Sequence, residues 1–168
     1  LSGGLADYIA EFITQFSYIP YLGEALLAVV FVIFQKAIAL SIDRDEWYVL
    51  SFVAPVMMLV YMSDIYVMLS YLVALIAAVL LCALYRRHPG IIWAGIATVL
   101  GYWLIGPAIF IFTLFAVIRE RNSKSLILIA LSVIVVVASR LTYLQQYPWK
   151  TVIFGINYYR LPITVPAM

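Results

Sequence analysis

A chain of 168 residues, of which 67% are hydrophobic and 11% are charged, cannot enclose its apolar surface inside a water-soluble domain. A net charge of +2, from scattered basic residues, argues against nucleic acid as a partner. The mean hydropathy of +1.10 instead favours an all-α, polytopic transmembrane helical bundle that forms a single domain over residues 1–168 and has membrane lipids as partners.

The first segment, 1–21, is predicted to be an amphipathic helix at the membrane surface. Apolar residues recur at helical spacing along 5–16, and the other side carries Asp7, Glu11 and Gln15. Because the segment is too short and too polar to span a membrane, we expect it to lie in the interface with its aromatic face toward lipid. The first residues include no Met and no basic leader, so we expect a fragment of a longer chain with a helix upstream.

The apolar stretches within 22–144 predict about five to six membrane helices. The first, 22–42, is about 31 Å long as a helix, close to the thickness of the hydrocarbon core. The next stretch, 47–85, is roughly two spans long, so we expect a hairpin that turns near Asp64. Pro55, in the first arm, is expected to kink that helix or to be accommodated by its neighbours.

The stretch 91–118 allows two interpretations. As one helix it would be about 42 Å long, which is long for one span and short for two. Gly101, Gly106 and Pro107 fall at its centre, among aromatic residues of the kind found at membrane surfaces. We therefore favour two short helices joined by a turn at the interface over a single kinked helix.

The last predicted span, 126–144, is followed by an aromatic tail, 145–168. The distribution of lysine and arginine gives the same orientation for either interpretation of 91–118. Both interpretations place the amphipathic segment and Asp64 on the extracytoplasmic side. We expect a multi-pass protein of a bacterial inner membrane.

Ionisable residues at membrane depth are the strongest functional candidates, because a charge is costly there unless it is paired or faces water. Asp64 could act as a base or cation ligand at a cavity mouth; alternatively, it is a hydrated turn residue that caps the next helix. Arg140, near the end of the last span, could bind a phosphate or pair with an acid; alternatively, it reaches the lipid headgroups.

Asp7 and Glu11 lie one helical turn apart on the polar face of the first helix. Repulsion between their carboxylates could raise one pKa and produce a general base for a hydroxyl acceptor. The candidate catalytic residues are thus Asp7 and Asp64, and the candidate substrate- or phosphate-binding residues are Arg140, Glu11 and Gln15. Alternatively, the residues of the first helix form only the solvated face that an interfacial helix needs.

Other catalytic patterns are missing from the sequence. One His and one Cys cannot build a transition-metal site, and there is no phosphate-binding glycine loop or Ser-His-Asp set. We therefore expect no metal and no cofactor.

Short motifs near both ends of the chain resemble an uncharacterised family of bacterial multi-pass membrane proteins. They are Gly3-Gly4-Leu5-Ala6-Asp7-Tyr8, Phe12, Thr14-Gln15-Phe16, Pro20 and Gly23, then Tyr147-Pro148 and Gly155-Ile156-Asn157-Tyr158-Tyr159-Arg160. More distantly, the acidic interfacial segment is similar to the C-type, polytopic glycosyltransferases, which use polyprenyl-phosphate sugars. That resemblance implies that Asp7 is the acidic residue of the first external loop and that Arg140 meets the donor phosphate. The given sequence departs from the pattern because it does not contain the helix that should precede the loop, and because Asp7 is expected on a helix rather than directly after a span.

Three functions follow as alternatives. The first is a glycosyltransferase-like protein, or an inactive relative, that acts on lipid-linked sugar at the extracytoplasmic face, with Asp7 or Asp64 as the base. The second is a transporter or channel component, in which the break at 101–107 lines a substrate site. The third is a non-enzymatic subunit that binds other membrane subunits.

Overall fold

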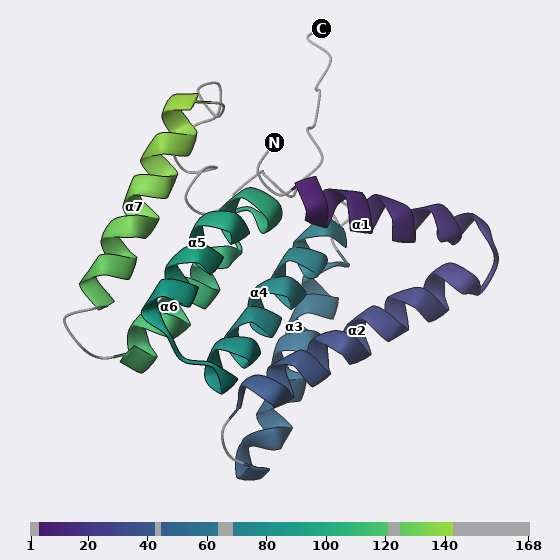
Figure 1. The fold of residues 1–168 in the computed structure, drawn as a ribbon. Helices are drawn as coiled ribbons and strands as arrows, with labels where there is room; N and C mark the ends of the chain where they lie inside the picture. The colour runs from purple at the N-terminus through teal and green to yellow at the C-terminus, as the bar shows by residue number, and fades with distance from the viewer. Residues whose placement is uncertain (1–3, 43–44, 64–68, 121–124, 143–168) are drawn as a thin grey trace, which may run out of the picture.

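The computed structural model describes residues 4–42, 45–63, 69–120 and 125–142. Within these ranges the chain is helical and contains no strand, which confirms the all-α prediction. Figure 1 shows the helices, which are, in chain order, α1 (Gly4–Gln15), η1 (Phe16–Tyr18), α2 (Leu22–Ser41), η2 (Asp45–Phe52), α3 (Val53–Tyr61), α4 (Leu69–Arg87), α5 (Ile91–Ile105), α6 (Ile109–Glu120) and α7 (Ser125–Thr142). The two η elements are 3-10 helices.

Three helices of the described residues are long and apolar enough to cross a membrane. They are α2 with 20 residues, α4 with 19 and α7 with 18, each about 27–30 Å long at 1.5 Å per residue. This composition and length are consistent with a membrane protein. The bounds of α2 and the start of α7 fall within one residue of the predicted spans at 22–42 and 126–144.

The first arm of the predicted hairpin changes helix type along its length. It begins as the 3-10 helix η2 and continues as α3, with Pro55 in the first turn of α3. A proline there removes no hydrogen bond within α3 itself, because the first N–H groups of an α-helix have no partner inside that helix. The change of helix type thus accommodates Pro55. The predicted turn at Asp64 lies outside the described residues.

The stretch 91–118 forms two helices, as the favoured interpretation predicted. Helix α5 ends at Ile105, Gly106 has a φ of 84°, and α6 starts at Ile109. Gly106 suits this turn because a side chain would strain a positive φ. Gly106 to Ala108 are buried within the protein, and the position of this turn at a membrane interface stays a prediction.

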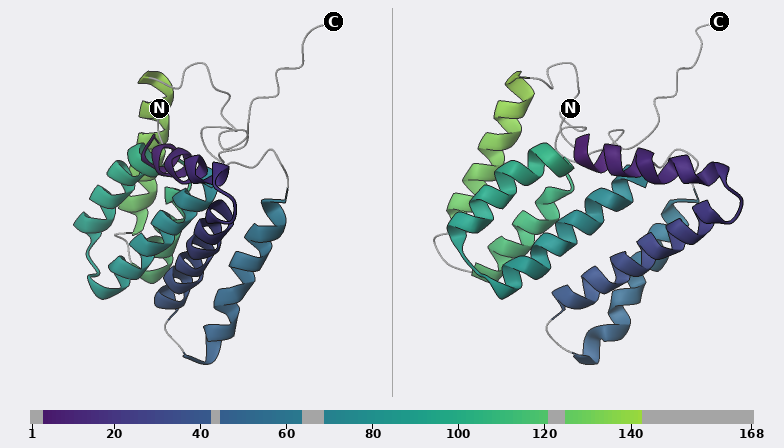
Figure 2. Two further views of the ribbon diagram at one scale, coloured as in Figure 1. Left: turned by 90° about the vertical axis from the view of Figure 1, so that its right-hand side faces the viewer. Right: turned by 45° about the vertical axis from the view of Figure 1, so that its right-hand side comes forward.

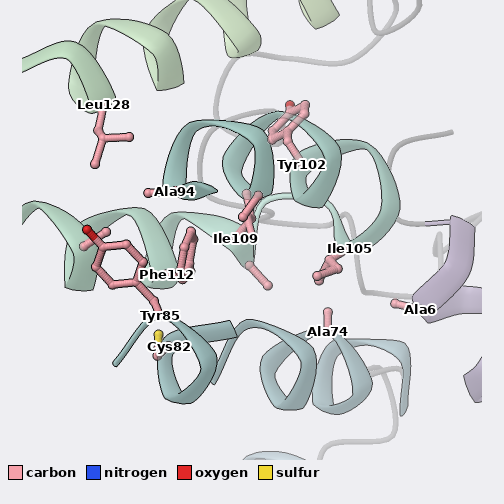
Figure 3. Close-up of a cluster of buried hydrophobic side chains, with 13 residues drawn as sticks. Ala6, Ala74, Cys82, Tyr85, Ala94, Tyr102, Ile105, Ile109, Phe112 and Leu128 are labelled. Carbon is pink, nitrogen blue, oxygen red and sulfur yellow. The ribbon is translucent and has the colours of Figure 1, made fainter. Parts of the chain in front are cut away.

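Helix α4 lies at the centre of the bundle, in contact with α1, α2, α5 and α6 (Figure 2). Its buried residues include four small ones at every fourth position, which lets neighbouring helices approach closely. These are Ser70, Ala74, Ala78 and Cys82. One side of α4 packs into a cluster with α5, α6 and α7 that contains Phe112 and Leu128, drawn in Figure 3. The other side packs with α2 and α3 around Phe34 and Met58.

Candidate functional site

Helix α1 lies across one end of the bundle, over α4 and α5 (Figures 1 and 2). It contacts the bundle through Ala6 and Ala10, which are 2% and 5% exposed. Ala6 belongs to the same buried cluster as Ile105 and Ala108, so α1 covers the turn between α5 and α6 (Figure 3).

The sequence pattern assigned two faces to α1, but the structure shows three. The alanine face packs on the bundle, and the polar face carries the acidic residues. The third face is apolar and exposed, and its residues are Leu5, Tyr8, Ile9 and Phe12. A helix at a membrane interface needs such an apolar face for the lipid, in addition to any face that it packs against the protein.

Asp7 lies at the boundary between the alanine face and the polar face, where it is half-buried. Loss of hydration raises the pKa of its carboxyl group above the ordinary value of 3.8, and the charge of Glu11 adds to the rise. The hydroxyl group of Ser70, in the first turn of α4, lies against the carboxyl group and opposes this shift. Asp7 therefore has the environment of a carboxylate that is more basic than usual.

The Ser70 hydroxyl is itself unusual. The side chain is 3% exposed, and its oxygen makes no hydrogen bond of ordinary geometry within the described part of the chain. A buried hydroxyl without such a bond costs about 1–3 kcal/mol. The contact between α1 and α4 therefore places two polar groups, Asp7 and Ser70, next to each other, and the Ser70 hydroxyl is the one that lacks an ordinary hydrogen bond.

A shallow, open hollow lies on the polar side of α1, where the chain turns toward α2. It is lined by Glu11, Thr14, Gln15, Ser17 and Tyr18. Two candidate binding residues of the sequence analysis, Glu11 and Gln15, thus share one concave surface. Asp7 lies one helical turn from Glu11 along α1 and is not among the residues that line the hollow.

The other candidates are not gathered around Asp7. Arg140 is half-buried in the last turn of α7, which packs against α5 and α6. The end of α7 that carries Arg140 and helix α1 both lie toward the same end of the bundle (Figure 1), but α5 contacts both helices and lies between them. Asp64 lies outside the described residues.

Sequence reasoning missed Ser70 and the three further residues of the hollow. Ser70 sits in a run that reads as a continuous membrane span, and the only available signal was an isolated hydroxyl in the first turn of an apolar helix. Thr14, Ser17 and Tyr18 come together only because η1 turns the chain after α1. In the part of the chain that the structure describes, no group of three or more His, Cys, Asp or Glu side chains could hold a metal ion.

The all-α fold, with its three long apolar helices, is consistent with the class of helical membrane proteins. A family model described as a family of unknown function, DUF6057, matches residues 1–168, and the chain belongs to this family. No curated protein and no solved structure matches the chain. The family agrees with the expectation of an uncharacterised family, and no similarity to glycosyltransferases is found.

Proposed function

We propose that this protein is a polytopic membrane protein of the glycosyltransferase type, which acts on lipid-linked sugar at the extracytoplasmic membrane surface. The observation that carries the proposal is the position of Asp7. Its carboxyl group is half-buried on a helix that lies across one end of the bundle, with a raised pKa. A general base is most effective when its pKa is near the operating pH. The environment of Asp7 raises its pKa toward that pH.

Helix lengths support a bundle of six membrane helices rather than three. Residues rise about 2.0 Å in a 3-10 helix and 1.5 Å in an α-helix, so the 8 residues of η2 and 9 of α3 together reach about 30 Å. The 15 residues of α5 and 12 of α6 reach only about 22 and 18 Å. Helix α1, which is about 10 Å thick, covers the turn between α5 and α6. Together with these short helices it spans about the thickness of the hydrocarbon core.

The charges support one orientation of this bundle in an inner membrane. Arg86 and Arg87 end α4, and Arg119 lies in the last turn of α6. These ends lie together, because the hydroxyl of Tyr85 donates a hydrogen bond to the carboxylate of Glu120. Basic residues favour the cytoplasmic side, so α1 and Asp7 belong on the extracytoplasmic side.

In the proposed reaction, Asp7 accepts the proton of an acceptor hydroxyl. The acceptor oxygen forms a bond to C1 of the donor sugar while the bond between C1 and the phosphate oxygen breaks. The electron pair of that bond leaves with the polyprenyl phosphate. The C-terminal end of α7, whose last turn carries Arg140, lies toward the same end of the bundle as α1 (Figure 1), and Arg140 is the proposed partner of the departing phosphate.

The test is sugar transfer from a polyprenyl-phosphate sugar in proteoliposomes. Asp7→Asn should lower the transfer rate by about 10²-fold or more, because loss of a general base costs 10²–10⁴-fold. Glu24→Gln is the matched control, since Glu24 is an exposed carboxylate in the first turn of α2. Full transfer by Asp7→Asn would refute Asp7 as the base.

A non-enzymatic membrane subunit is the second candidate function. The observation that favours it is the separation of Asp7 and Arg140 by α5, because a transfer site needs base and phosphate partner within reach of one substrate pair. In this case Asp7→Asn would leave sugar transfer in the cell unchanged. Loss of co-purification with other membrane proteins on replacing the exposed Tyr8 and Phe12 by Ser would then support the subunit role.

A further inference from the structure

We infer that the hollow formed by Glu11, Thr14, Gln15, Ser17 and Tyr18 is a binding site for a neutral saccharide. The role of this saccharide rests on the proposed function: there, it is the acceptor whose hydroxyl group gives its proton to Asp7.

The lining of the hollow excludes an anionic ligand. Among the residues that the structure describes, it contains one carboxylate, one amide, two aliphatic hydroxyls and one phenol, and no lysine, arginine or histidine. A phosphate or carboxylate group would meet the negative charge of Glu11 with no cation to offset it. The lipid phosphate of a donor therefore does not belong here.

The hydrogen-bonding groups of the hollow match a ligand that brings its own donors. The Thr14 hydroxyl already donates to the main-chain carbonyl of Glu11 at 2.8 Å, which leaves its oxygen free to accept. The Glu11 carboxylate accepts only, and the Gln15 amide can both donate and accept. A sugar presents several hydroxyl groups, each of which can donate to one of these acceptors.

Tyr18 adds a flat apolar surface to this polar set. It is 93% exposed, yet it lines the hollow beside glutamate and glutamine and lies outside the apolar face of α1. An exposed aromatic ring beside polar groups suits a ligand with an apolar face and a polar rim. A pyranose ring has this character, because its C–H bonds gather on one face and its hydroxyls lie around the edge.

The corner that forms the hollow has a fixed shape. Tyr21, just before α2, has a φ of 67°, a left-handed conformation that a residue with a side chain rarely adopts. Gly23 lies so close to Ser17 that a Cβ atom on it would be 2.7 Å from the Ser17 Cα. Unusual backbone held in place by tight packing is typical of functional sites, and it keeps the lining residues preformed.

The position of Asp7 connects the hollow to the proposed reaction. Asp7 and Glu11 are one helical turn apart, which separates their Cβ atoms by about 6 Å. A saccharide bound at the Glu11 end of the hollow would therefore present its hydroxyl groups toward Asp7. The hollow thus holds the acceptor, while the donor phosphate lies toward Arg140.

The test measures saccharide binding without any donor. The protein in nanodiscs is titrated with lactose, cellobiose and methyl glucoside, and contacts are followed by saturation-transfer-difference NMR. Tyr18→Ala and Gln15→Ala should each weaken binding at least 10-fold, whereas Tyr18→Phe should retain most of it. Tyr8→Ala is the matched control, because Tyr8 is 70% exposed on the apolar face of the same helix.

The outcomes separate the two proposals. Absence of binding by all three sugars, equal weakening by Tyr8→Ala and Tyr18→Ala, or preferential binding of inorganic phosphate would overturn the saccharide site. If sugars bind in the hollow but Asp7→Asn transfers sugar normally, the site stands and the proposed function fails. If Asp7→Asn abolishes transfer but no sugar binds in the hollow, the function stands and the saccharide site fails.

Discussion

Arg86 in the last turn of α4 donates a hydrogen bond to the main-chain carbonyl of Ile42, the residue that caps α2. The same guanidinium nitrogen also donates to the carbonyl of Leu40 at 3.0 Å. The last carbonyls of a helix have no partner within it and carry a partial negative charge, so a cation stabilises that end. Arg86 thereby joins two of the three longest helices at the end of the bundle opposite α1.

Replacing Arg86 by leucine should lower the free energy of unfolding by about 1–3 kcal/mol, because two hydrogen bonds from a charged group are lost. Thermal or urea unfolding in detergent measures the change. Arg87→Leu is the matched control, since Arg87 is an exposed arginine at the next position. It should change stability by less than about 0.5 kcal/mol. Equal effects of the two variants would contradict the capping role.

A second prediction concerns the hairpin of α5 and α6. A Cβ atom on Gly101 would overlap the side chain of Ile109, which is fully buried and stiff because it is branched at Cβ. Gly101→Ala should therefore destabilise the protein by about 1–3 kcal/mol. In a double-mutant cycle, Gly101→Ala combined with Ile109→Ala should destabilise the protein by less than the sum of the two single changes.

The control for this prediction is Gly4→Ala, because a Cβ atom on Gly4 would meet nothing within 4 Å. If Gly101→Ala and Gly4→Ala unfold at the same temperature, α5 and α6 do not approach each other as closely as described.

A third prediction concerns pH. Burial raises the pKa of Asp7, so the folded protein favours the protonated form more than the unfolded chain does. The stability contribution of Asp7 is therefore full below its unfolded value, near 3.8, and is lost as the pH rises through the folded value. Docking of α1 onto α4 should thus be tightest in acid.

Protection factors of the α1 amides, which are exchange rates corrected for the intrinsic rate at each pH, measure this dependence between pH 4 and 7. Asp7→Asn should flatten the pH dependence and slow exchange at pH 7, because the amide carries no charge to bury. Glu24→Gln should behave as the unchanged protein does. Sugar transfer should have the opposite trend and rise with pH, since a base must be ionised to accept a proton. Unaltered pH dependence in Asp7→Asn would refute the burial of this carboxyl group.

Helix positions could be predicted where the sequence itself contains the physical cause. The apolar run of α2 has the length of a membrane, and a helix cannot continue past Gly106 and Pro107, so these features were correctly predicted. The amphipathic helix at 5–16 was also correct within one residue at each end. Periodicity alone predicted a helix with one apolar face and one polar face, however. Alanine is too weakly apolar to reveal that Ala6 and Ala10 form a third face, which packs on the protein.

The candidate site could be predicted only in part. Asp7, Glu11 and Gln15 share a face of one helix, so local spacing was enough to group them. Ser70 is distant in sequence, and its contact with Asp7 depends on how α1 crosses α4. The relation between Asp7 and Arg140 likewise depends on the packing of α5 between their helices, which no spacing encodes.

The position of α1 at the membrane surface is the central claim, and depth-dependent fluorescence quenching tests it most directly. Single cysteines replace Tyr8, Phe12 or Gln15 in a Cys82→Ala background, because Cys82 is the single native thiol and is buried. Each is labelled with bimane in liposomes. The labels at positions 8 and 12 should be quenched by doxyl lipids and shielded from iodide, while the label at 15 should be quenched by iodide. Equal quenching of all three labels by iodide would contradict the account.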